Sequence, residues 1–441
     1  MTIIESLAAY GAQLSTAPLS PAVLHHAKRA VIDWYAALLP GAVCEPPTLL
    51  EQALADDLDH GRARLALGRA ASTRTAALIN GTAAHTVEFD DIYREAIYHP
   101  GAPTIAAAWA VAQETNASGL DLLRAVVAGY EISTRIGATL GRAHYKHWHN
   151  TGTVGSFGAA AAAATLYRLP PSAYAHAMAT VGTFAAGLQQ AFRMDSMSKP
   201  LHAGRAAEAG VLAAQAARAG VTGSLDILEG EAGMGVAMGS GPNWLPMLGD
   251  LGQVFNIQHM TFKNHACCGH TFAAIDGALA LQQRMGVAAE DLAEVHIETY
   301  QPALDVAGNP NPQTAAEARF SLPFVVASAL VHGSVRLAAF TPERLADAQV
   351  RGLMQRLSLR ADAQIDAGFP GQRAARVRLV TRDGREDVFF QPNRKGDPED
   401  PLTDADLDSK FIELAAPVIG DAKARALLQQ LWQLEQAAQL P

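Results

Sequence analysis

The sequence predicts a mainly α-helical fold: a large helical domain formed from both ends of the chain and a smaller inserted α+β domain. Apolar residues recur at helical spacing through roughly the first 260 residues. Alternation typical of strands appears only after that point, and residues 404–440 are helical again. We therefore assign residues 1–262 plus 397–441 to the helical domain and residues 263–396 to the α+β domain.

The first part of the chain is predicted to form helices at residues 21–39, 102–114, 121–137, 155–167, 172–190 and 202–219. The helix at 155–167 consists largely of alanine and glycine, and Pro170-Pro171 ends it. Small side chains let helix backbones approach closely. We therefore expect this helix at the centre of a bundle.

The α+β part is predicted from strands at residues 294–300, 376–381 and 388–391, with a hairpin turn at Asp383-Gly384. Helices are expected at residues 316–332 and 342–357, and the polar residues 393–401 resemble a linker.

Composition excludes several classes of function. A formal net charge of −9 over 441 residues, without a basic stripe, argues against nucleic-acid binding. Three cysteines without framework spacing, and an N-terminus unlike a secretory signal, favour a cytoplasmic protein. No apolar run of about 18 residues suggests a membrane span. Neither a GxGxxG fingerprint nor a GxxxxGK[ST] loop is present, so we expect no cofactor.

Titratable residues gather in short clusters. The first joins Glu88, Asp90 and Asp91 to His99, which stands before Pro100-Gly101 at the start of a predicted buried helix. Carboxylates placed this close together need water, a cation or a base as a neighbour. A loop before a helix suits anion binding or catalysis. A solvated acidic turn with a capping histidine is the alternative interpretation.

Two further clusters precede predicted buried helices. His149 stands before the alanine-rich helix, where an imidazole near free backbone N–H groups can bind a carboxylate or transfer a proton. Lys199 stands before a helix expected to begin at Pro200, with Arg193 and His202 nearby. The alternatives are a structural histidine and an exposed lysine. We expect His144 and His147 at the surface.

The last cluster contains Lys263, His265, Cys267, Cys268 and His270. The spacing fits zinc poorly because vicinal cysteines rarely bind one metal together, so we predict no metal site. A Cys-His nucleophile remains an alternative. Substrate contacts or packing are the favoured roles, and we select Lys263 and His270 as substrate-binding residues.

Taken in order, these clusters resemble the MmgE/PrpD family. The matching segments are AAHTVEFDD, HPGAPTIAAAWAVAQ, GYEISTRIG, WHNTGTVGSFGAAAAAA, SKPLHAGRAAEAG, CCGHTFAAIDGAL and GDPEDPLTDADLDSKF. They cover almost the whole chain. Each motif alone has low specificity, whereas the ordered set is specific.

The resemblance implies a helical domain with an α+β lid, a homodimer, and an active site between the helical domain and the lid. It also implies proton chemistry on a small polycarboxylate substrate without a cofactor. His99, His149 and Lys199 match family motifs and are the expected catalytic residues. The substrate-binding residues are expected to be Glu88, Asp90, Asp91, Arg193, His202, Lys263 and His270.

The chain departs from the family pattern in places that bear on the reaction. Ile92-Tyr93 stands where relatives often have Thr-His or Thr-Trp, and Gly269 where an arginine often follows the cysteines. We expect a hydro-lyase of the 2-methylcitrate dehydratase type. An epimerase of an amino dicarboxylate such as iminodisuccinate is the second expectation, and a cis-aconitate-type decarboxylase the third. A non-catalytic dicarboxylate-binding relative is a further alternative.

Overall fold

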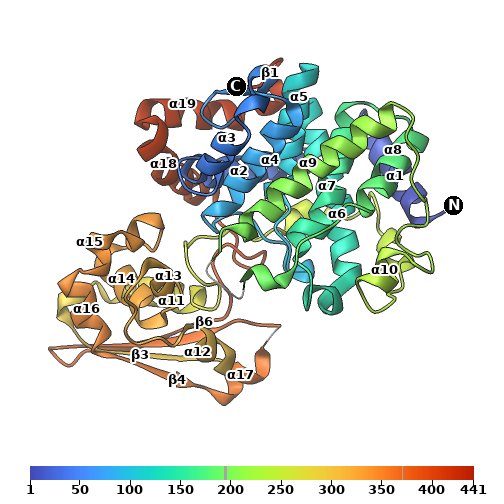
Figure 1. The fold of residues 1–441 in the computed structure, drawn as a ribbon. Coiled ribbons are helices and arrows are strands. Elements are labelled where there is room, and N and C mark those ends of the chain that lie inside the picture. The colour runs from blue at the N-terminus through green and yellow to red at the C-terminus, as the bar shows by residue number, and fades with distance from the viewer. Residues whose placement is uncertain (193–195, 370) are drawn as a thin grey trace. The chain divides into compact units, whose positions relative to one another are not determined.

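The computed structural model describes residues 1–192, 196–369 and 371–441, and it confirms the mainly α prediction (Figure 1). The chain divides into two compact units. Unit 1 is Met1–Phe262 with Thr403–Pro441, and unit 2 is Lys263–Leu402. None of the helices in these ranges combines the length and apolar character needed to cross a membrane.

Unit 1 is helical apart from one short strand pair. Its elements are α1 (Ile3–Leu14), α2 (Pro21–Ala42), α3 (Pro47–Ala53), β1 (Leu58–Arg64), β2 (Ala70–Ala71), α4 (Thr73–Thr86), α5 (Gly101–Thr115), α6 (Gly119–Tyr145), α7 (Asn150–Leu166), α8 (Pro171–Gly182), α9 (Ser198–Arg218), α10 (Met234–Ala237), α18 (Asp404–Ile419) and α19 (Asp421–Trp432).

The alanine-rich helix α7 lies at the centre of unit 1. Every residue of α7 is buried, and α7 packs against α5, α6, α8 and α9. Alanine and glycine on all sides allow these close contacts. The helix begins at Asn150, so His149 is its N-cap residue.

Helices α4 and α9 cross very closely. A Cβ added at Gly81 would lie 3.0 Å from Cα of Gly204, and one added at Gly204 would overlap Oγ1 of Thr82 and the carbonyl oxygen of Leu78. Only glycine allows this approach. The crossing brings together two helices that carry site residues.

Both ends of the chain meet in unit 1. The late helices α18 and α19 pack on each other and on the early helix α2 (Figure 1). Buried Lys410 of α18 forms an ion pair with Asp33 of α2, with 2.6 Å between Nζ and Oδ1. The C-terminal segment is therefore part of the helical core.

Unit 2 is a four-stranded sheet with helices packed on it. Strand order is β4-β3-β5-β6, with β3 parallel to β4 and antiparallel to β5. The elements are α11 (Phe272–Met285), β3 (Leu292–Thr299), α12 (Gln301–Ala307), α13 (Ala315–Arg319), α14 (Leu322–His332), α15 (Pro342–Leu345), α16 (Ala348–Met354), β4 (Leu357–Ala361), α17 (Ala363–Gly368), β5 (Ala375–Thr381) and β6 (Glu386–Gln391).

Two helices predicted for this part are interrupted. Ser321 caps a new helix, α14, and so separates it from α13. Asp347 accepts the backbone N–H groups of Gln349 and Val350 and starts α16 after α15 has ended. The segment resembling a linker is also packed, since Arg394 and Asp397 are buried and paired 2.9 Å apart.

Candidate active site

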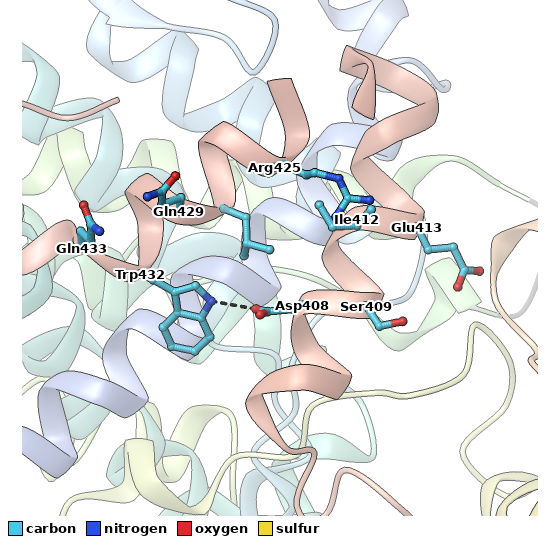
Figure 2. Close-up of a pocket in the computed structure, with 9 residues that line it drawn as sticks. Asp408, Ser409, Ile412, Glu413, Arg425, Gln429, Trp432 and Gln433 are labelled. Carbon is cyan, nitrogen blue, oxygen red and sulfur yellow. Dashed lines mark hydrogen bonds between the residues drawn. The ribbon is translucent and has the colours of Figure 1, made fainter. Parts of the chain in front are cut away.

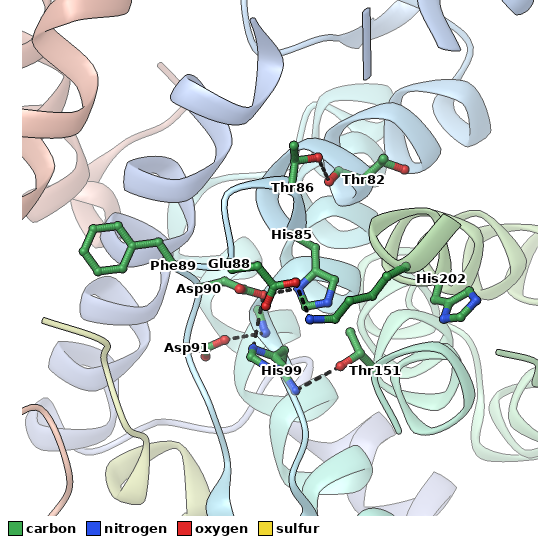
Figure 3. Close-up of polar contacts among 12 residues, drawn as sticks. Thr82, His85, Thr86, Glu88, Phe89, Asp90, Asp91, His99, Thr151 and His202 are labelled. Carbon is green, nitrogen blue, oxygen red and sulfur yellow. Dashed lines mark hydrogen bonds and ion pairs between the residues drawn. The ribbon is translucent and has the colours of Figure 1, made fainter. Parts of the chain in front are cut away.

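Asp90, a buried residue in the loop after α4, contacts two histidines. Its Oδ2 lies 2.7 Å from Nδ1 of His85, in the last turn of α4. The same oxygen lies 3.4 Å from Nδ1 of His99. Figure 3 shows these side chains directed toward one another. One carboxylate oxygen therefore hydrogen-bonds to His85 and also faces the ring of His99.

His149 extends this group of histidines. Its ring stacks on that of His85, with 5.4 Å between centroids. Its Nδ1 lies 3.1 Å from Nδ1 of His202 in α9. A hydrogen bond between these two nitrogens needs one proton, so His149 and His202 cannot both be doubly protonated.

Lys199 places a cation next to the histidines. It lies within the first turn of α9, which begins at Ser198 and not at Pro200 as expected. Its ammonium group donates a hydrogen bond to Oε1 of Glu88, whose backbone is left-handed at φ 56°. The Lys199 side chain stays 23% exposed and the Glu88 side chain 38%. Both remain accessible to a small ligand.

Asp91 holds the loop to the next helix. It accepts the Gly101 N–H of α5 at 3.0 Å and the Tyr130 hydroxyl at 2.7 Å. Since Gly101 starts the helix after His99-Pro100, these bonds fix the approach of the chain to α5. Both carboxylate oxygens of Asp91 contact protein groups.

Burial and neighbouring charges keep His149 and His202 neutral. Burial, His85 and Lys199 hold the pKa of His149 well below its usual range, and burial lowers the pKa of His202. Burial raises the pKa of Asp90, but the effect of His85 and His99 is larger. The pKa of Asp90 therefore lies well below its usual range. The group thus offers neutral imidazoles beside an ionised carboxylate and a lysine, a combination suited to proton transfer.

A metal ion is an alternative occupant of this group. The ligand atoms of His85, Asp90 and His99 lie within 4.8 Å of one another. However, the 2.7 Å between His85 and Asp90 is a normal hydrogen-bond length. We therefore describe His85 and Asp90 as a hydrogen-bonded pair, with Nδ1 of His99 3.4 Å from the same Asp90 oxygen.

The structure brings together a subset of the predicted site residues. Unit 1 gathers Glu88, Asp90, His99, His149, Lys199 and His202, with Asp91 supporting their loop. Lys263 and His270 belong to unit 2, where Lys263 is buried. Arg193 lies outside the described residues.

In unit 2, His270 has its own polar neighbours. Its Nδ1 lies 2.8 Å from the Tyr300 hydroxyl, and burial together with Arg373 and Arg394 lowers the pKa of His270 to about 4. His265 instead pairs with Asp276, 2.8 Å away. The two histidines of this cluster therefore have different partners.

The cysteines of this cluster are poor nucleophiles. Burial raises the pKa of the Cys267 and Cys268 thiols, which disfavours the reactive thiolate. The Sγ atom of Cys267 lies 3.2 Å from Oγ1 of Thr271. This environment favours packing over nucleophilic catalysis.

Sequence reasoning missed some members of the site. His85 lies in the AAHTVEFDD segment and contacts Asp90, five residues later, which is a local signal that could have identified it. Tyr130 gave no signal, because its contact with Asp91 joins distant segments. The expectation of a surface His144 was wrong: its ring is buried and contacts the Met238 carbonyl oxygen at 2.8 Å and Thr153 Oγ1 at 2.7 Å.

A groove of about 700 Å³ lies elsewhere in unit 1, between α18 and α19 (Figure 2). Within it the Trp432 indole N–H donates to Asp408 Oδ1 at 2.7 Å. The groove contains no histidine and lacks the lysine and carboxylate of the His149 group. Its lining residues are Asp408, Ser409, Ile412, Glu413, Arg425, Leu428, Gln429, Trp432 and Gln433.

The chain combines a helical unit, which holds a buried group of histidines and carboxylates, with an α+β unit. This combination defines its class of protein. Residues 5–246 match the MmgE/PrpD N-terminal domain, and residues 265–434 match the MmgE/PrpD C-terminal domain. The chain belongs to the MmgE/PrpD family, which confirms the resemblance seen in its motifs.

Three similar proteins are named as cis-aconitate decarboxylases or as a cis-aconitate decarboxylase-like protein. The cis-aconitate decarboxylase of Homo sapiens is 28% identical over 374 residues, which cover 82% of this chain and 76% of the human protein. The cis-aconitate decarboxylase-like protein oryM of Aspergillus oryzae is 27% identical over 455 residues, covering 97% and 93%. A cis-aconitate decarboxylase of Aspergillus terreus is 22% identical over 450 residues, covering 96% and 91%.

Proposed function

We propose that this chain is a lyase that acts on a small polycarboxylate by moving a proton at a carbon next to a carboxylate. The observation that carries the proposal is the group formed by His99, His149 and Lys199 around Asp90 and Glu88. Neutral imidazoles can accept a proton, and a lysine can neutralise a carboxylate or the charge that develops beside it. The group needs no added cofactor for this chemistry.

Binding of a polycarboxylate changes the ionisation of the group. In the ligand-free protein, burial and the nearby positive charges of His85 and Lys199 lower the pKa of His149 and so disfavour its protonation. Anionic carboxylates next to His149 have the opposite effect and raise its pKa. The bound substrate thus converts His149 into an acid able to return a proton to carbon.

Decarboxylation is the reaction that we place first. The similar proteins named above are cis-aconitate decarboxylases or a decarboxylase-like protein. In this reaction the bond to one carboxylate breaks, carbon dioxide leaves, and its electron pair enters the remaining carbon chain. A proton from the protein then adds to carbon. His149 is the proposed donor, and Lys199 holds a remaining carboxylate.

Dehydration of a 2-methylcitrate-like substrate is the second candidate, and the Lys199–Glu88 contact is the observation that favours it. A lysine beside a carboxylate can deliver a proton to a leaving hydroxyl group while an imidazole removes the proton from the adjacent carbon. The carbon–oxygen bond then breaks and water leaves.

Direct product analysis separates these reactions. Purified protein is incubated with cis-aconitate, citrate or 2-methylcitrate, and products are followed by NMR together with carbon dioxide release. We expect carbon dioxide from cis-aconitate. A new double bond from a hydroxy acid, without carbon dioxide, would support the dehydratase instead. Inactivity on all three, with deuterium entering a chiral amino dicarboxylate, would favour an epimerase.

Substitutions at the site test the residue roles. His149→Ala and Lys199→Ala should each lower kcat at least about 100-fold, the usual range for lost acid–base catalysis, without loss of the fold. His147→Ala and Lys146→Ala are matched controls, because both residues are exposed and close in sequence to His149. Near-normal rates in both site variants, with circular dichroism unchanged, would refute the site.

A further inference from the structure

Lys410 lies directly behind the loop that carries the acidic site residues. The residue is fully buried in α18, and its ammonium group donates to the Phe89 carbonyl oxygen at 2.9 Å. The same nitrogen lies 4.2 Å from the centroid of the Phe89 ring and 2.6 Å from Oδ1 of Asp33. Lys410 therefore contacts the loop and pairs with a carboxylate of α2.

Phe89 stands between two residues of the proposed site. Glu88 on one side contacts Lys199, and Asp90 on the other orients His85 and His99. Figure 3 shows the Phe89 ring directed away from the histidines, while Glu88 and Asp90 face them. The peptide group after Phe89 is therefore the point at which the two catalytic contacts can be fixed together.

The loop begins directly after α4. Glu88 follows the C-cap residue Val87 and is in the left-handed region at φ 56°, as is common where a helix ends. The charge-assisted hydrogen bond from Lys410 to the carbonyl oxygen of the next residue is a strong contact on this loop. The Phe89 ring, 0% exposed, supplies the apolar part of the anchor.

We propose that Lys410 is a positioning residue for the reaction: it holds the Phe89 peptide so that Glu88 meets Lys199 and Asp90 meets His85 and His99. The catalytic part of this inference rests on the proposed function. The structural part concerns the orientation of His99 and stands without it. Lys410 itself touches no reacting atom.

Removing Lys410 alone is a poor test, because it leaves Asp33 as a buried carboxylate without this counter-ion. Replacing a whole buried ion pair by apolar residues of similar size is commonly tolerated. The informative variant is therefore the double substitution Asp33→Leu with Lys410→Met. It removes both charges together with the donor to the Phe89 carbonyl.

Lys410→Arg is the conservative variant, since arginine keeps a buried cation and N–H donors. Lys28→Met is the matched control. Lys28 also ties α2 to the C-terminal segment, through Glu435 at 2.8 Å and the Trp432 carbonyl oxygen at 3.0 Å. Neither of these contacts involves the loop at residues 88–91.

Two readouts are measured on each variant. The first is kcat on the substrate found active above, and the second is the NMR signals of the labelled His99 and His149 rings. We expect the double variant to unfold near the wild-type temperature, with kcat reduced about 10- to 100-fold, a size seen for lost supporting contacts. Its His99 signal should shift. The Lys410→Arg variant should retain most of the wild-type kcat. The kcat of the Lys28→Met variant should stay within about twofold of the wild-type value.

Contrary results are equally clear. A folded double variant with wild-type kcat and unmoved His99 signals would overturn the proposal. So would failure of the double variant to fold if Lys410→Arg also loses kcat as a stably folded protein, because positioning predicts rescue. A shifted His99 signal in a protein inactive on every polycarboxylate would leave the positioning role supported and the proposed function refuted.

Discussion

Asp90 and Asp91 are adjacent carboxylates with opposite ionisation. Asp90 faces His85 and His99, which hold its pKa well below the usual range, whereas burial and the nearby charge of Asp33 raise the pKa of Asp91 to about 8. A single peptide bond thus separates an ionised carboxylate, oriented toward the imidazoles, from a protonated one that binds Tyr130.

The ionisation of His149 can be measured directly. In the ligand-free protein we expect its pKa well below 6.5, because burial and neighbouring positive charge oppose protonation. Histidine-selective NMR titration, assigned with His149→Gln, gives the value. Addition of citrate should raise it. A pKa near 6.5 that citrate leaves unchanged would contradict the electrostatic description of the site.

Asp91→Asn should change how stability depends on pH. The wild-type carboxyl keeps its proton up to about pH 8 when folded but loses it near 3.8 when unfolded. Between these values the unfolded state binds fewer protons, so wild-type stability should fall by about 1.4 kcal/mol per pH unit as pH rises. The variant lacks this contribution. Urea unfolding at pH 5, 6, 7 and 8 should show that the stability of the variant rises relative to that of wild type as pH increases. If the stabilities of the two proteins change with pH in parallel, the raised pKa of Asp91 is contradicted.

At the scale of elements, the site depends on two helices, α4 and α9, whose backbones approach closely at Gly81 and Gly204. Helix α4 carries His85, and α9 carries Lys199 and His202. At their crossing a Cβ on Gly204 has no room, because Thr82 and the Leu78 carbonyl occupy that space. The spacing between the two sets of site residues is therefore set by a glycine.

Gly204→Ala should move these helices apart. Alanine favours helix formation by about 1 kcal/mol, but overpacking against backbone costs about 1–3 kcal/mol or more. We expect net destabilisation in urea unfolding and a fall in kcat. Gly352→Ala is the control, since a Cβ there meets only the end of the Arg356 side chain at 3.9 Å. An equally stable Gly204→Ala protein would show that the crossing can relax.

The sequence predicted those elements whose signals are local. The buried helix after His149 and the hairpin at Asp383-Gly384 follow from composition and turn residues close in the chain. The break at Ser321 was missed because a cap can interrupt an apolar run without changing its periodicity. The contact of Lys410 with Phe89 joins residues 321 positions apart, and no local pattern reports such a pair.

At the scale of the whole molecule, the two units differ in how they gain stability. Unit 1 buries small residues between helices, as α7 shows. Unit 2 instead buries alternate residues of β3 and β5, and α11 packs on β5 and β6. The family resemblance adds the expectation of a homodimer.

The homodimer can be tested by light scattering after gel filtration. We expect twice the chain mass of 46.4 kDa at micromolar concentration. Dilution to nanomolar concentration should leave the mass unchanged if the interface is of the large, permanent kind. Ovalbumin serves as a calibration standard of a size similar to one chain. A mass of one chain at both concentrations would contradict the expectation of a homodimer.

The position of Lys410 also bears on how the protein is made. Translation delivers α4, α7 and α9 long before α18, so the loop at residues 88–91 leaves the ribosome without its anchor. An interrupted synthesis that stops before residue 403 would yield a chain with every proposed catalytic side chain and an unsupported loop. Such a fragment lacks the contact of Lys410 with Phe89, so the loop would gain its anchor only after α18 has been made.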